Sequence, residues 1–215
     1  MTLVFATGAE IAGNDDVNIT MERNTGADAT GAFRFKQVPA PSKTDAATNA
    51  KVELIVGRRD SNGAPLAALV DGLLPSGQDE PTSNFFYATG TDGGRFRLDL
   101  GSPLEISEIN TYSWHASSRG PQVYNLYISD GTEANFNPAP DAKTHPAHVG
   151  WKLLAAVDTR PKEGGRMGGQ YGVNIRGKAG SLGKFRYLLF DAVEAEYTDP
   201  FGNTFFSEID VVAKQ

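Results

Sequence analysis

Apolar and polar residues alternate along this chain in short runs, and clusters of Gly, Pro, Asn and Asp separate the runs. Alternation of this kind is typical of β-strands that bury one face, and the clusters are typical of turns. We therefore expect about eight to ten short strands with long loops, which predicts an all-β fold, an antiparallel β-sandwich or jelly roll. The expected strands are 52–56, 85–87, 95–100, 106–114, 123–129, 151–157, 171–175, 185–191 and 205–212, with one helical turn at 67–69.

Residues 1–50 differ from the rest of the chain. Two runs, 17–21 and 32–38, alternate as half-buried strands do, among clusters of Gly, Asn and Asp. Because two strands cannot form a stable domain alone, we expect residues 39–47 to cross the surface in an ordered way rather than to act as a linker. The predicted organisation is an N-terminal extension, 1–50, packed on a main domain, 51–215.

Charge and composition narrow the ligands that the protein can bind. The formal net charge is −6, and no basic stretch is present that would neutralise nucleic-acid phosphates or favour anionic membrane surfaces. Without cysteine, disulfides, thiolate nucleophiles and Cys-ligated metals are excluded. No apolar run approaches the ~20 residues of a membrane-spanning helix, so we expect no membrane insertion. A neutral glycan is compatible with this balance.

The start of the chain leaves the compartment open. Residues 1–6 lack a basic region, and their apolar run is too short for a signal peptide. Both a processed secreted protein and a cytosolic protein are consistent with these residues.

Seven pieces, in order along residues 52–212, together resemble the galactose-binding-like β-sandwich. This is the fold of discoidin (coagulation factor type C) domains and of many bacterial carbohydrate-binding modules. The pieces are the Asp-Gly element at 69–72, the strand ending in Asp-Leu-Gly at 95–101, the strand at 106–112, the strand running into Ser-Asp-Gly at 124–131, the Trp strand at 151–154, the Arg-Tyr strand at 185–188 and the closing Ser-Glu strand at 206–211. The chain departs from the pattern in its extension, 1–50, in an expanded hairpin at 132–150, and in Leu73, where the family has Asn.

The resemblance implies a non-catalytic carbohydrate-binding module for glycan recognition or adhesion. Its ligand would lie on loops at one end of the sandwich, and the protein would be secreted or on the cell surface, with other domains of a longer chain as further partners. Two alternatives stay open. One is a protein-interaction or structural module of a larger cell-surface protein, and the other is a polysaccharide-active hydrolase or lyase. No recognisable catalytic pair or motif supports the enzyme alternative.

The loop after residue 114 carries the first candidate ligand residues. Aromatic faces stack on sugar rings, and His or Arg donors bind hydroxyls, which suits Trp114, His115 and Arg119. Strand alternation places Trp114 with Tyr112 on one face and His115 on the other, so one of these faces is expected in the core. A packed core ring is therefore an equal alternative for Trp114, and a loop salt bridge is the alternative for Arg119.

Two further loops add candidates. The resemblance places an aromatic ring and an Asn of the final loop against the sugar, and Phe201 and Asn203 match in kind. An equal alternative is that Phe201 caps the end of the barrel and Asn203 fills a turn. The Gly-rich segment 165–171 offers Arg166 and Tyr171, although a flexible hairpin without a ligand is the favoured alternative there.

Asp71 and Glu208 are the candidate metal ligands. In the family, a structural calcium ion often lies between the Asp-Gly loop and the Glu of the closing strand, and both positions match here. The alternative is that Glu208 accepts hydrogen bonds from the loop backbone without a metal.

Overall fold

The computed structural model describes residues 16–25, 29–162, 165–198 and 200–214, and within them the fold is an antiparallel β-sandwich. The predicted fold class is therefore confirmed. Most expected strands form, with ends shifted by one or a few residues. The strands are β1 (Val17–Asn24), β2 (Lys51–Val56), β3 (Gly94–His115), β4 (Val123–Ser129), β5 (Lys152–Asp158), β6 (Gly169–Gly177), β7 (Gly183–Ala192) and β8 (Phe206–Ala213).

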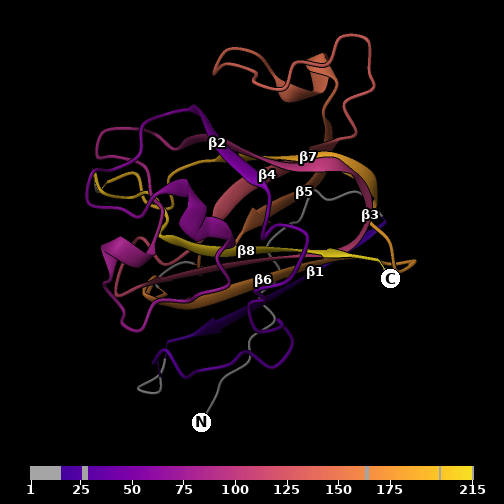
Figure 1. Ribbon diagram of the computed structural model, residues 1–215. Coiled ribbons are helices and arrows are strands. Elements are labelled where there is room, and N and C mark those ends of the chain that lie inside the picture. Colours follow the sequence, from indigo (N-terminus) through magenta and orange to yellow (C-terminus); the bar gives the residue numbers. More distant parts are fainter. Residues whose placement is uncertain (1–15, 26–28, 163–164, 199, 215) are drawn as a thin grey trace.

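Strand β3 joins the two layers of the sandwich. Its first part pairs with β2 and β7, its second part pairs with β6 and β8, and the register with β7 shifts between Asp99 and Leu104. One layer is thus β2–β3–β7–β4–β5 and the other is β1–β6–β3–β8 (Figure 1). The expected strands 95–100 and 106–114 form this one bent strand, because Gly101 adopts a φ of 82° that turns the backbone without ending the ladder.

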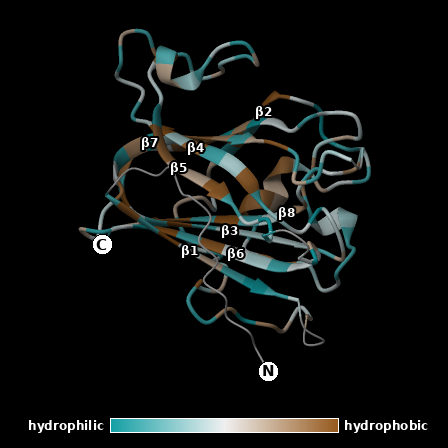
Figure 2. Ribbon diagram, turned by 180° about the vertical axis from the view of Figure 1, so that it is seen from behind, coloured by the Kyte–Doolittle hydropathy of each residue, from teal (hydrophilic) through white to brown (hydrophobic). Residues whose placement is uncertain are grey.

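The core lies between the layers and is rich in aromatic rings. Phe96 on β3 stacks on Phe190 of β7, with ring centroids 4.8 Å apart, and Phe206 of β8 meets Phe96 edge-on at 5.8 Å. All three rings are buried. Figure 2 shows hydrophobic residues concentrated in the strands and hydrophilic residues in the surrounding loops.

The N-terminal extension is partly built into the sheet. Strand β1 confirms the expected strand at 17–21 and pairs with β6 along its whole length. The expected strand at 32–38 is wrong, because the Glu22 carboxylate accepts the backbone N–H groups of Lys36, Gln37 and Val38 at 3.2, 2.6 and 2.9 Å. The alternation at 32–38 reflects a covering segment that lies over the sheet with Phe33 and Phe35 half-buried and Val38 buried.

Short connections complete the fold. The expected helical turn forms as the 3₁₀ helix η1 (Leu66–Val70), and η2 covers Pro81–Ser83. The expected strand at 85–87 is reduced to two isolated bridges, Phe85 with Phe206 and Arg59 with Tyr87. Residues 130–151 connect β4 to β5 as a projecting arm, which contains η3 (Pro146–Val149) (Figure 1). Within the described residues, no helix has the length and apolarity needed to cross a membrane.

Candidate functional site

A buried guanidinium organises one end of the sandwich. The rings of Phe86 and Phe205 stack with centroids 4.2 Å apart, and the Arg119 guanidinium carbon lies 4.3 and 4.2 Å from them. Arg119 Nε donates to the Asn203 carbonyl at 3.1 Å. The loops that carry Arg119 and Asn203 therefore lie together, as expected. Because Arg119 is only 9% exposed, its guanidinium fixes the loops and is not an open donor for sugar hydroxyls.

His115 is held beside the same rings. Its imidazole meets Phe205 edge-on at 4.6 Å, and its Nδ1 accepts the Ser117 backbone N–H at 3.1 Å. Accepting at Nδ1 assigns the proton to Nε2, which lies 3.8 Å from the Asp79 carboxylate. His115 thus lies at the expected end of the sandwich, but its side chain is 12% exposed and already engaged.

Trp114 lies on the opposite face of β3, as alternation predicts. It is 4% exposed and lines a narrow cavity together with Phe33 and Phe35 of the extension. A sugar has no access to the Trp114 ring in this arrangement, because the extension covers that face. The alternative of a packed ring describes Trp114 correctly.

Two other side chains that were expected to contact the sugar, those of Tyr171 and Asn203, also point inward. Tyr171 is 1% exposed, and its hydroxyl donates to the Met167 carbonyl. The Asn203 side chain is buried as well, and its Nδ2 donates to the Thr91 carbonyl at 2.8 Å. Both side chains hold the loops in place, so neither can bind a sugar directly in this arrangement.

The exposed rings at this end are on the loop between β7 and β8. Phe201 is 50% exposed and Tyr197 is 68% exposed. The Arg119 guanidinium carbon lies 5.9 Å from the Phe201 ring centroid, and that of Arg160 lies 6.0 Å from the Tyr197 ring centroid. The loop therefore presents two aromatic faces, each supported by a cation.

A shallow pocket of about 280 Å³ lies beside Tyr197. Asp158 fixes Arg160 in its wall, with Nε 3.0 Å from Oδ1, and this carboxylate raises the pKa of Arg160. Arg166 is exposed and lies between two lining residues. The lining residues are Arg160, Pro161, Lys162, Gly165, Met167, Ala195, Glu196 and Tyr197.

Sequence reasoning missed Tyr197 and Arg160. A large aromatic residue in a polar, non-periodic loop was the available signal for Tyr197, because such a ring has no strand face to bury it. No pattern in the sequence indicates that Arg160 reaches this ring, since the two lie on loops after different strands.

The proposed metal ligands do not fit a cation site. Glu208 Oε2 accepts the backbone N–H groups of Asp71 and Gly72 at 3.1 and 2.8 Å, and Oε1 accepts that of Ile209 at 3.1 Å. Backbone N–H donors thus bind both oxygens of the Glu208 side chain, whereas a cation would need these oxygens as its own ligands. Burial, together with nearby Asp210, raises the pKa of Glu208 to about 9.

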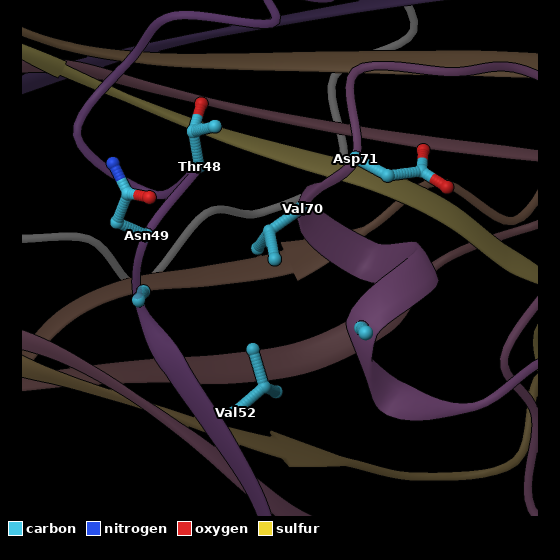
Figure 3. Close-up of a pocket in the computed structure, with 7 residues that line it drawn as sticks. Thr48, Asn49, Val52, Val70 and Asp71 are labelled. Carbon is cyan, nitrogen blue, oxygen red and sulfur yellow. The ribbon is translucent and has the colours of Figure 1, made fainter.

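Asp71 does not complete a ligand set either. Its Oδ1 accepts the Leu73 backbone N–H at 2.9 Å. Figure 3 shows its side chain pointing away from Thr48 and Asn49. Among the described residues, no group of three or more His, Asp or Glu side chains could hold a metal ion. The geometry therefore agrees with the metal-free alternative for Glu208.

Comparisons with known proteins give distant structural likenesses. No family model and no curated protein matches the chain. Similar solved structures include the family 32 carbohydrate-binding module of Clostridium perfringens NanJ with galactose, at 10% identity and a TM-score of 0.49 over 77% of this chain and 95% of that one. The lectin domain of lectinolysin with Lewis B antigen matches at 12% identity and a TM-score of 0.49, over 80% and 98%. SpGH29 matches at 15% identity and a TM-score of 0.44, over 80% of this chain but 28% of its own. The sugars named belong to those proteins.

Proposed function

We propose that this protein is a non-catalytic carbohydrate-binding module that holds a glycan on the loop between β7 and β8. The exposure of Tyr197 and Phe201 on that one loop, beside the guanidinium groups of Arg160 and Arg119, carries the proposal. Aromatic faces stack on the C–H faces of pyranose rings, and neighbouring cations donate hydrogen bonds to hydroxyls. Arg160, Lys162 and Arg166 would supply those donors.

The rigid support behind the rings favours binding. Arg119 and Asn203 tie the loop to its neighbours through hydrogen bonds at 3.1 and 2.8 Å. A platform that is ordered before the ligand arrives loses little conformational entropy on binding. The expected roles of Arg119 and Asn203 are therefore replaced by a positioning role.

The same pocket argues against catalysis. Glycoside hydrolysis needs two carboxyl groups across the scissile bond. Among the described residues that line this pocket, Glu196 alone carries a carboxylate. Binding without turnover is the function that these residues support, in a protein that we expect to be secreted or on the cell surface. Release of reducing ends from a polysaccharide by the isolated protein would contradict this conclusion.

A glycan array tests the proposal most broadly. We expect wild-type protein to bind a subset of glycans, and Phe201→Ala to bind them about tenfold more weakly. A sugar that covers the exposed half of the Phe201 ring removes at most about 100 Å² of apolar surface from water. Burial of part of that area contributes about 1–2 kcal/mol to the binding free energy. Leu73→Ala is the matched control, since Leu73 is 52% exposed and Phe201 is 50% exposed. Equal binding by both variants, or no glycan bound by wild type, would overturn the proposal.

A further inference from the structure

A second groove lies at the end of the sandwich opposite Tyr197 and Phe201. Strand β7 runs from Gly183 to Ala192, and the Tyr197 loop follows its last residue. The new groove adjoins the first residues of β7 and β5 and the last residues of β4, so the length of the strands separates it from the Tyr197 loop. Its volume is about 560 Å³, within the usual range of small-molecule sites.

The arm, residues 130–151, forms one wall of this groove and is held firmly. Arg95 NH1 donates to the carbonyls of Asp141 and Thr144 at 2.6 and 2.8 Å, while its Nε and NH2 pair with Asp191. Arg97 NH1 donates to the Pro138 carbonyl at 2.7 Å. Both arginines are buried. Long connections with little regular structure are usually functional when they are ordered, and this one is fixed by two buried cations.

The base of the arm is anchored in the same way. Trp151 Nε1 donates to the Asn137 carbonyl at 2.8 Å, and Ser129 Oγ donates to the Gly150 carbonyl at 2.8 Å. The Trp151 ring packs against Phe136 at 5.3 Å and Tyr187 at 6.3 Å. The wall of the groove is therefore preorganised and needs no ligand to order it.

The groove carries hydrogen-bonding groups of balanced charge, and among them Asp130 Oδ1 already accepts from the Thr132 backbone N–H and hydroxyl. Asp130 and Glu133 lie on the arm side, whereas Lys152 and Lys184 lie on β5 and β7. Within the described part of the chain, the side chains of Glu133, Lys152 and Lys184 make no hydrogen bond or ion pair. Asn135 adds an amide whose Nδ2 already donates to the His148 carbonyl, which leaves its oxygen to accept.

Two acids and two ammonium groups favour a ligand without net charge. A ligand rich in hydroxyls fits such a site, because each hydroxyl can donate to a carboxylate and accept from an ammonium group. Ile128, Leu182 and Phe185 also line the groove, but all three are buried, so they supply a small apolar area beneath the polar groups. A polar rim over apolar atoms is the arrangement that sugar rings need.

We propose that this groove is a second saccharide site, selective for neutral sugars, which makes the module bivalent. The choice of a saccharide rests on the proposed function of the Tyr197 loop, whereas the site itself rests on the arm. With sites at opposite ends, one module could link two glycan chains and gain avidity on a multivalent surface.

Calorimetric titration with three neutral disaccharides, lactose, cellobiose and diacetylchitobiose, tests the proposal. We expect at least one of them to bind with two equivalents. Lys184→Ala and Glu133→Ala should each lower the affinity of one of the two bound equivalents by about tenfold or more, since each variant removes a charged hydrogen-bonding partner. Lys143→Ala, a lysine on the arm outside the groove, should change neither equivalent. Tyr197→Ala should weaken only the other equivalent.

The outcomes separate the two proposals. A single equivalent that Tyr197→Ala abolishes, and that Lys184→Ala and Glu133→Ala leave unchanged, would overturn the second site and leave the proposed function standing. A single equivalent that only the groove variants weaken would overturn the Tyr197 site instead. No binding of any of the three disaccharides by wild type would overturn the second site, and the glycan array then decides the proposed function separately. Equal affinity for sialyllactose and lactose at the groove would refute its selectivity for neutral sugars.

Discussion

Replacing Arg119 with alanine should destabilise the fold before it affects any ligand. Arg119 is 9% exposed, and its guanidinium carbon lies 4.3 and 4.2 Å from the Phe86 and Phe205 ring centroids. A desolvated cation–π contact contributes about 2 kcal/mol, and a hydrogen bond from a charged donor, here to the Asn203 carbonyl, contributes about 1.5–3 kcal/mol. Because the buried cation also has a desolvation cost, we expect a net loss of about 2–4 kcal/mol in the free energy of unfolding.

Thermal unfolding followed by circular dichroism measures this loss. In a chain of this length, about 2–4 kcal/mol lowers Tm by about 5–15 °C. Arg166→Ala is the control, because Arg166 is an exposed arginine of a nearby loop, and its Tm should match that of wild type. If Arg119→Ala keeps the wild-type Tm but no longer binds glycan, then Arg119 contacts the ligand and its assigned positioning role is refuted.

Three further predictions concern the carboxylates around β8 and the extension. Burial raises the pKa of Asp210 to about 6, so wild type loses stability as pH rises from about 4 to about 6, and the Tm of Asp210→Asn minus that of wild type should become more positive over that range; a constant difference would show that Asp210 does not titrate there. Glu22→Gln should cost about 1–2 kcal/mol and speed amide exchange at 36–38, because an amide nitrogen cannot accept those N–H groups; unchanged exchange would disprove the anchoring role. Excess calcium and excess chelator should give the same Tm, since backbone N–H groups occupy the Glu208 oxygens, and a rise with calcium would restore the metal site.

The strands were predictable because burial of one face leaves a period of two in the sequence. That period identified β4, β6 and β7 and separated Trp114 from His115 correctly. It could not say that the outer face of β3 is covered, because the cover comes from residues far away in the sequence. The two alternatives for Trp114 therefore stayed equal at the level of sequence.

The loops were less predictable for a related reason. The resemblance to the galactose-binding-like fold placed the loops of Arg119 and Asn203 at one end of the sandwich, and their hydrogen bond confirms it. Residue type could not show that both side chains turn inward, since burial of a loop side chain depends on tertiary contacts. The pairing of Arg160 with Tyr197 depends on how two separate loops meet, and no local pattern encodes that.

The most direct test of the proposed function is titration of the Tyr197→Ala, Phe201→Ala double variant with the glycan that wild type binds most tightly on the array. We predict an unchanged Tm, because both rings are exposed, together with affinity for the Tyr197 loop reduced about a hundredfold, from about 1–2 kcal/mol for each ring. Wild-type affinity in a double variant that folds normally would contradict the placement of the sugar on this loop.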